Sequence, residues 1–246
     1  MGRKQYMLYM ANYTNQGGRP YNEDSYGVFT KGNGLCAAVA DGLGGYGGGD
    51  IASRTAVNMI GDFYMEASDL SGKRIRDWFS QINRQVYDMQ TGECKMKTTL
   101  AVLFASSTQC RWAHVGDTRV YHFLNNDLKD MTLDHSVPQM AVFSGEITQA
   151  EIRQHKNRNK LLRAIGYQTE IEADVSTVID ITRGNHSFLL CTDGFWEYVE
   201  EDEMADTLAQ SSNPVEWINK MTVILQSRVT GKNDNNTAVA VWRNND

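Results

Sequence analysis

The stretch Leu100-Ala101-Val102-Leu103-Phe104 decides the fold, because it is as long as a strand and every one of its side chains is apolar. Successive side chains of a strand point to opposite faces of the sheet, so a run without polar alternation predicts a strand covered on both faces. Working outward from this run, we expect strands at Met7–Tyr13, Leu35–Ala40, Thr99–Ala105, Arg111–Val115, Val120–Leu124, Phe188–Cys191 and Thr237–Trp242.

Three segments carry apolar residues at helical spacing, within Ala52–Phe63, Ile75–Val86 and Ile218–Val229. A further helix-rich stretch is expected over Ser136–Leu162. Paired helices between groups of strands favour antiparallel sheets covered by helical hairpins over a βαβ winding. We therefore predict an α+β fold: an αββα four-layer sandwich whose two central, mostly antiparallel sheets are flanked by helical hairpins.

The chain has 246 residues, a length that fits one domain over residues 1–246, and a formal net charge of −6. This acidic balance argues against a dedicated nucleic-acid binder, which would normally be basic. The longest apolar runs are six residues, far short of a membrane span, and we expect no secretory signal in the segment after Met1. The four cysteines form no CxxC pair, which favours free thiols in a reducing cytoplasm. The prediction is a cytoplasmic monomer that needs neither nucleic acid nor membrane.

Acidic residues recur where the apolar strands end. Asp41, Asp117 and Asp193 lie within two residues after the end of a strand, and Asp234 lies three residues before the last one. Each alone is compatible with an ordinary turn, because Asp-Gly and Asp-Asn are common turn formers. If the strands form one sandwich, however, the four carboxylates can converge at one rim, where they repel one another unless a cation is present. Oxygen ligands without paired His or Cys favour Mg²⁺ or Mn²⁺.

The glycine-rich stretch Gly42-Leu43-Gly44-Gly45-Tyr46-Gly47 offers a rival interpretation, a dinucleotide-binding loop with Asp62 as the ribose contact. Two observations oppose it. Asp41 would repel a pyrophosphate at the mouth of the loop, and Asp62 falls within a helical stripe rather than at the end of a second strand.

The segment Arg19-Pro20-Tyr21-Asn22-Glu23-Asp24 places a guanidinium beside two acids. It could be a salt-bridged surface loop. Alternatively, Arg19 could bind a phosphate in a bidentate manner.

Taken in order, these segments resemble the metal-dependent serine/threonine protein phosphatases of type 2C, in their short bacterial form. The matching stretches span residues 19 to 239 and are Arg19–Ser25, Val39–Gly45, Thr98–Leu100, His114–Tyr121, Asp134–Ser136, Arg163–Gly166, Leu190–Gly194 and Asp234–Val239.

The resemblance implies the αββα sandwich predicted above and assigns a role to each site residue. Asp41 would bridge two metal ions and hold the attacking water, Gly42 would add its carbonyl oxygen, and Asp193 and Asp234 would complete one shell. Further roles are implied for Glu23 and Asp24 (holding metal-bound water), Arg19 (clamping the phosphate), Asp117 (a third ion) and residues 136–162 (a flap beside the site).

The implied activity is metal-dependent hydrolysis of phosphoserine and phosphothreonine in proteins, with Mn²⁺ or Mg²⁺ as two ions and a third ion as an option. Phosphorylated proteins, among them a serine/threonine kinase, would be the partners. The alternative is a catalytically weak phosphoprotein-binding module of the same fold. Leu43 occupies a position where long family members often carry a histidine, so the group that protonates the leaving oxygen is not identified. A cysteine phosphatase is excluded, because no arginine stands six positions after any of the four cysteines.

Overall fold

The computed structural model describes residues 7–44, 48–92 and 94–243, and it contains two large antiparallel sheets. The first sheet has the order β1-β13-β12-β8-β9, and its strands are β1 (Leu8–Asn15), β13 (Asn236–Arg243), β12 (His186–Cys191), β8 (Arg119–Leu124) and β9 (Asp127–Met131). The second has the order β10-β7-β6-β3-β2, with β11 (Ile179–Asp180) also paired to β7; its other strands are β10 (Asp174–Val175), β7 (Gln109–Val115), β6 (Leu100–Ala105), β3 (Gly34–Ala40) and β2 (Ser25–Lys31).

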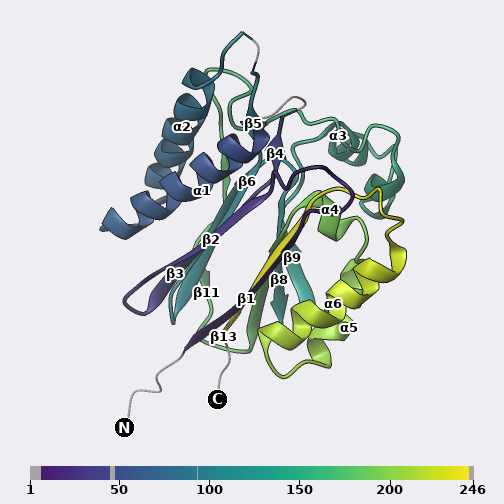
Figure 1. Ribbon diagram of the computed structural model, residues 1–246. Helices are drawn as coiled ribbons and strands as arrows, with labels where there is room; N and C mark the ends of the chain where they lie inside the picture. The colour runs from purple at the N-terminus through teal and green to yellow at the C-terminus, as the bar shows by residue number, and fades with distance from the viewer. Residues whose placement is uncertain (1–6, 45–47, 93, 244–246) are drawn as a thin grey trace.

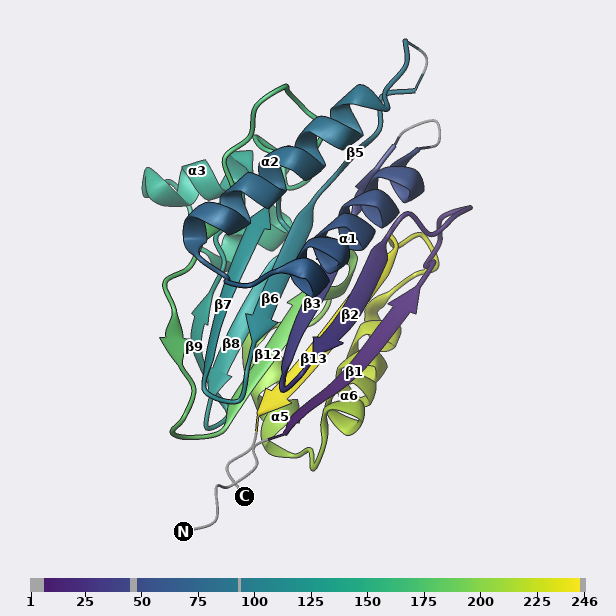
Figure 2. The same cartoon turned by 90° about the vertical axis from the view of Figure 1, so that its left-hand side faces the viewer.

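Helices cover the outer face of each sheet. The hairpin of α1 (Gly49–Glu66) and α2 (Gly72–Asp88) lies across β2, β3, β6 and β7, as Figure 2 shows. The pair α5 (Glu201–Ala209) and α6 (Pro214–Arg228) lies on the far side, against β1 and β13 (Figure 1). The predicted αββα sandwich of antiparallel sheets and helical hairpins is confirmed.

The run that predicted the layers is buried on both faces. Leu100, Val102 and Phe104 pack with α1 and α2, whereas Ala101 and Leu103 pack against the other sheet. A third apolar layer, which includes Trp217 and Met221 of α6, fills the space between the first sheet and its helices. Two rigid sheets therefore stand back to back, and the loops at their ends are held at fixed positions.

Residues 136–162 are less helical than expected. They hold α3 (Val137–Phe143) and the 3₁₀-helix η1 (Ala150–Gln154), and the rest is mostly turns. Ser136 caps α3 by accepting a hydrogen bond from the Gln139 backbone, and Gly145, at a φ of 77°, follows the end of the helix. The apolar residues of this stretch are too widely spaced to continue the helix past Gly145.

The glycine-rich stretch 42–47 is described only in part, because Gly45, Tyr46 and Gly47 lie outside the described residues. Gly42–Leu43 forms the short strand β4, which pairs antiparallel with β5 (Lys97–Thr98). The helix that follows, α1, leads into α2 and not into a parallel strand, and β3 is antiparallel to both its neighbours. A dinucleotide loop needs a parallel βαβ unit, so its rejection is confirmed.

Within the described ranges, no helix is both long and apolar enough to cross a membrane.

Candidate active site

A cleft of about 1240 Å³ opens at the end of the sandwich where β3, β7 and β12 end. The four aspartates predicted to converge all line it: Asp41 after β3, Asp117 after β7, Asp193 at the start of α4 (Asp193–Trp196) and Asp234 before β13. Arg19, Glu23 and Gly42 line the same cleft, and Asp24 lies outside its lining. The antiparallel topology thus gathers residues more than 200 positions apart.

Asp41 is fixed by two threonines of the neighbouring strand. Its backbone N–H donates to Thr99 Oγ1 (2.9 Å), and its carbonyl accepts from Thr98 Oγ1 (2.8 Å) and from the Thr99 N–H (2.9 Å). The Thr99 hydroxyl also lies 2.6 Å from that of Thr118, directly after Asp117. Sequence reasoning noted Thr98 and Thr99 only as part of a motif; their role as the link between two carboxylate loops needs the pairing of β6 with β7 to be seen.

Gly42 is required by close packing. A Cβ atom there would meet the carbonyl oxygens of Gly49 and Glu23. The Gly42 N–H donates to the Glu23 carbonyl (3.2 Å), which also accepts from Ser53 Oγ (2.6 Å). Glycine at this position therefore brings the loop carrying Glu23 against the start of α1.

Asp24 is buried below the cleft, where Thr192 Oγ1 donates to its Oδ2 (2.9 Å). Its Oδ1 is buried, and no described atom donates to it. Burial raises the pKa of Asp24 to about 8, although hydrogen bonds from Thr237 and Thr192 act in the opposite direction. For Glu23, burial likewise raises the pKa, while a hydrogen bond from the Gly49 backbone lowers it. Two carboxyl groups thus lie in surroundings short of positive charge.

Asp193 carries the clearest sign of an absent partner. Its Oδ1 is buried without a donor among the described residues. Burial first, and then the charges of Glu197 and Asp234, raise the pKa of Asp193 to about 7. The pKa of Asp41 is raised well above its ordinary value by burial and by the charge of Asp193. The described groups leave this concentration of negative charge without full compensation.

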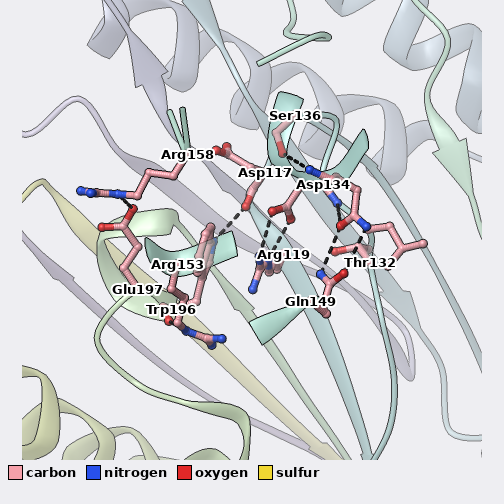
Figure 3. Close-up of polar contacts among 12 residues, drawn as sticks. Asp117, Arg119, Thr132, Asp134, Ser136, Gln149, Arg153, Arg158, Trp196 and Glu197 are labelled. Atoms are coloured by element: carbon pink, nitrogen blue, oxygen red, sulfur yellow. Dashed lines mark hydrogen bonds and ion pairs between the residues drawn. The ribbon is translucent and has the colours of Figure 1, made fainter. Parts of the chain in front are cut away.

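Asp117 is 5% exposed and held through its backbone, because its carbonyl accepts a hydrogen bond from Trp196 Nε1 (3.0 Å). Among the described residues, Asp117 makes no ion pair with Arg119, two positions further on. Figure 3 shows that Arg119 instead binds Asp134 through two hydrogen bonds of 2.8 Å each, while its guanidinium stacks 3.5 Å from the Trp196 ring. The Asp117 carboxylate therefore has no ion pair with the nearest arginine in the sequence.

The Arg119–Asp134 pair joins the two sides of the cleft. Asp134 precedes the 136–162 segment, and Trp196 belongs to α4, which begins with Asp193. The segment itself adds two arginines to α4 and the loop that follows it. Arg153 donates to the Trp196 carbonyl (3.0 Å), and Arg158 pairs with Glu197 (Figure 3). None of these contacts was evident from the sequence, since the partners are 15 to 43 residues apart.

Arg19 reaches across the cleft mouth. Its Nη2 lies 2.6 Å from Asp234 Oδ2, and the two side chains are 54% and 37% exposed. The loop that carries Arg19 is tied to the same place by Asn235, whose side chain donates to the carbonyls of Gln16 and Tyr21. Sequence reasoning did not assign this role to Asn235. Arg19 is thus positioned at the mouth of the cleft as a partner for an anion.

The two histidines near the site are structural in their contacts. His114 and His135 are buried and stack on each other with ring centroids 4.6 Å apart, and His114 Nε2 lies 2.9 Å from the Leu133 carbonyl. Neither lines the cleft, whereas Leu43 does. No described histidine lies where it could protonate a leaving group.

The donor set fits a hard divalent cation. Every candidate ligand is an oxygen, two carboxylate oxygens are buried without donors, and mutual repulsion is strong. In residues 7–44, 48–92 and 94–243, no three His, Cys, Asp or Glu side chains are already gathered as a metal shell. Arg19 partly compensates Asp234 there, so binding a cation would involve displacing this guanidinium and drawing the carboxylates together.

The chain was compared with known proteins. The sequence profile described as Protein phosphatase 2C matches residues 15–226. A protein named Serine/threonine phosphatase stp from Listeria welshimeri is 34% identical over 92% of each chain. Protein phosphatase PhpP of Streptococcus pneumoniae is 29% identical over 77% of this chain and 84% of its own length.

Solved structures agree with these relatives. The fold matches a bacterial serine phosphatase with a TM-score of 0.87 at 24% identity, over 97% of this chain and 99% of that one. The catalytic domain of the serine threonine protein phosphatase PstP, in complex with two manganese ions, matches with a TM-score of 0.79 at 26% identity, over 98% and 100% of the two chains. The chain therefore belongs to the protein phosphatase 2C family, which confirms the sequence-based prediction of a protein phosphatase.

Proposed function

We propose that this enzyme hydrolyses phosphoserine and phosphothreonine in proteins, using two Mn²⁺ or Mg²⁺ ions held at the cleft. The observation that carries the proposal is the meeting of Asp41, Asp193 and Asp234 in one cleft, with a buried Asp193 oxygen that lacks a donor among the described residues. The names of the relatives and the manganese complex of PstP support it.

In this proposal, Asp41 would bind both ions, the Gly42 carbonyl would be a further ligand, and Asp193 and Asp234 would complete one shell. Glu23 and Asp24 would orient metal-bound water, and Asp117 together with Asp193 would hold a weaker third ion. Divalent ions held here would supply an activated water and polarise the phosphate oxygens. Hydrogen bonds from Thr98 and to Thr99 would hold the Asp41 backbone in place when cations bind nearby.

Arg19 then binds the substrate phosphate. It is exposed at the cleft mouth and pairs with a carboxylate oxygen of Asp234 at 2.6 Å, which supports this role. With a cation at Asp234, the guanidinium would be available to a phosphate, whose geometry it matches. Leu43 offers no proton, so we assign the leaving-group proton to water in the cleft.

We propose further that residues 1–246 act as one catalytic domain, with residues 136–162 as a flap over the site. The contacts of Arg153 and Arg158 with α4 and the loop after it support this placement. We expect a cytoplasmic monomer that acts on phosphorylated proteins, a serine/threonine kinase among them, without nucleic acid or membrane.

Asp41→Asn tests the proposal, because it removes the central charge and keeps the volume of the side chain. We expect loss of turnover of about a thousandfold or more on a phosphothreonine peptide, with an unchanged circular dichroism spectrum. Wild-type activity should vanish with chelator and return with Mn²⁺ or Mg²⁺. A wild-type protein that binds phosphopeptide with Mn²⁺ but never releases phosphate would instead be the binding module.

A further inference from the structure

The cleft is divided by charge. Its acidic part holds the aspartates described above, and another part of its lining holds three basic side chains, Lys95, Lys97 and Arg163, which we call the basic wall. Arg19 also lines the cleft, but unlike Arg19 the three residues of the basic wall have no part in the proposed hydrolysis.

Main-chain pairing fixes the basic wall next to the metal-binding carboxylates. Lys97 lies on β5 directly opposite Leu43 of β4, two residues after Asp41. The Thr98 N–H donates to the Ile165 carbonyl (3.1 Å), and the Ile165 N–H donates back to Thr98 (2.8 Å). This bridge holds Arg163 and Tyr167, on either side of Ile165, beside β5.

The ammonium group of Lys97 makes a cation–π contact with an aromatic ring. Its Nζ lies 4.5 Å from the centroid of Tyr167, a side chain that is 53% exposed at the cleft. Arg163 contacts Asp174 Oδ1 at 3.1 Å, with both side chains about half exposed, so this pair is well hydrated. Among the described residues, the ion pairs of the carboxylates that line the cleft use Arg19 and Arg54, and not the basic wall.

We infer that the basic wall binds an anionic side chain of the substrate, a carboxylate or a second phosphate, close in sequence to the residue being dephosphorylated. This inference rests on the proposed function, since it selects among phosphoprotein substrates. A cation–π contact leaves the Lys97 ammonium oriented and able to accept an anion on its open side.

The distance sets the expected spacing. Neighbouring strands lie about 4.8 Å apart, and an extended peptide advances about 3.3–3.6 Å per residue. Lys97 is one strand away from Leu43, so its flexible side chain serves an anion within about three residues of the phosphothreonine.

The experiment is a peptide scan. One glutamate is moved from position −3 to +3 around a phosphothreonine in an otherwise uncharged peptide, and each peptide is compared with its glutamine counterpart by kcat/KM. A second series carries a non-hydrolysable phosphonate analogue of phosphothreonine in place of glutamate, which separates the two sources of charge without adding a second substrate. We expect a preference for the anion of about threefold to fivefold at one or two neighbouring positions, decreasing at high ionic strength.

Variants locate the effect. Lys97→Met and Lys95→Met should reduce the anion preference, Lys97→Arg should retain it, and Lys129→Met, which removes the same charge from exposed β9, should leave it at the wild-type value. Equal preferences in the wild type, Lys97→Met and Lys95→Met would overturn the inference. So would a preference of the same size at every position, which indicates only a general field.

A failure of the basic-wall inference can be distinguished from a failure of the proposed function. Hydrolysis of the uncharged reference peptide without any anion preference leaves the phosphatase proposal intact and rejects the basic wall. If no peptide is hydrolysed, fluorescence anisotropy of labelled peptides bound to the wild-type protein in the presence of Mn²⁺ decides the point, since it measures binding without turnover.

Discussion

Arg19 has two anionic partners at different stages, which makes it the residue whose role depends most on the metal. It pairs with Asp234 at 2.6 Å, and in the proposed enzyme it binds phosphate. The hydrogen bond to Asp234 is the largest cause of the raised pKa of Arg19, and the charge of Asp234 is the second. We expect the guanidinium to move when a cation binds Asp234.

Arg19→Ala should raise KM for a phosphothreonine peptide by about threefold to tenfold, because a partly exposed, charge-assisted contact with the substrate is lost. The change in kcat should be smaller, since no candidate metal ligand is altered. The same variant should bind the first ions at least as tightly as the wild type, because the competitor for Asp234 is gone. Steady-state kinetics and calorimetry measure both effects; an unchanged KM would return Arg19 to the role of a surface loop residue.

At the scale of the element, buried strands were predicted closely, whereas the exposed strand β9 and the partly exposed strand β2 were missed. The runs at 35–40, 99–105 and 237–242 begin and end within one residue of β3, β6 and β13, because both faces of these strands are apolar. The strand β9 was missed, since four of its five residues are exposed and polar or isolated, and it exists through pairing with β8. The edge strand β2, which has glycine at its third position, was also missed.

The candidate site likewise has residues that could be predicted from the sequence and contacts that could not. Asp41, Asp117, Asp193 and Asp234 were found from the sequence because each adjoins an apolar run, which is a local signal. The Arg119–Asp134 pair could not be found, because its partners are separated by 15 residues and β9, and either could have paired elsewhere. A local sequence pattern predicts where a strand ends. Which loops then lie together depends on how the strands pair in the assembled sheets.

The Arg119–Asp134 pair makes a prediction about the stability of the loops that it joins. Both side chains are at most 2% exposed, so removing the Asp134 charge leaves Arg119 buried with only its longer contact to Glu201 (3.6 Å) as an ion pair. Asp134→Asn should lower the free energy of unfolding by about 3–5 kcal/mol. Asp88→Asn is the matched control, because it breaks the exposed Arg84–Asp88 pair and should cost about 0.2–1 kcal/mol. Urea unfolding measures both, and equal losses would argue against the buried network as a stabilising element.

For the whole molecule, three apolar layers supply a stable scaffold that tolerates repelling carboxylates at one end. Burial is the largest cause of the raised pKa values of Asp24, Asp41, Asp117 and Asp193. The sandwich holds these groups together although their repulsion opposes it, and the metal-free protein relieves the strain partly by keeping protons. Metal binding and proton release are therefore coupled.

This coupling predicts how stability depends on pH. Asp24 and Asp193 have pKa values of about 8 and about 7 in the folded chain, above the ordinary 3.8. The folded state then binds more protons than the unfolded state between pH 4 and pH 8, so the free energy of unfolding falls as the pH rises through this window. His122 and His135, whose pKa values are lowered to about 4, act in the opposite direction, but only below about pH 6.5.

The comparison is therefore made at pH 6.5 and pH 8.0, above the range of the histidines. The metal-free protein should lose about 3–6 °C in Tm between these two values, because 1 kcal/mol corresponds to about 2–4 °C for a chain of this size. Mn²⁺ should raise Tm more at pH 8.0 than at pH 6.5, since at the higher pH it displaces fewer protons from its ligands. Asp193→Asn, which removes one titrating carboxyl group, should flatten the metal-free decline and reduce the gain from Mn²⁺. A metal-free Tm that stays level or rises between pH 6.5 and 8.0 would show that the carboxylates are ionised without a cation, and that the charge at this end of the sandwich is balanced by other groups.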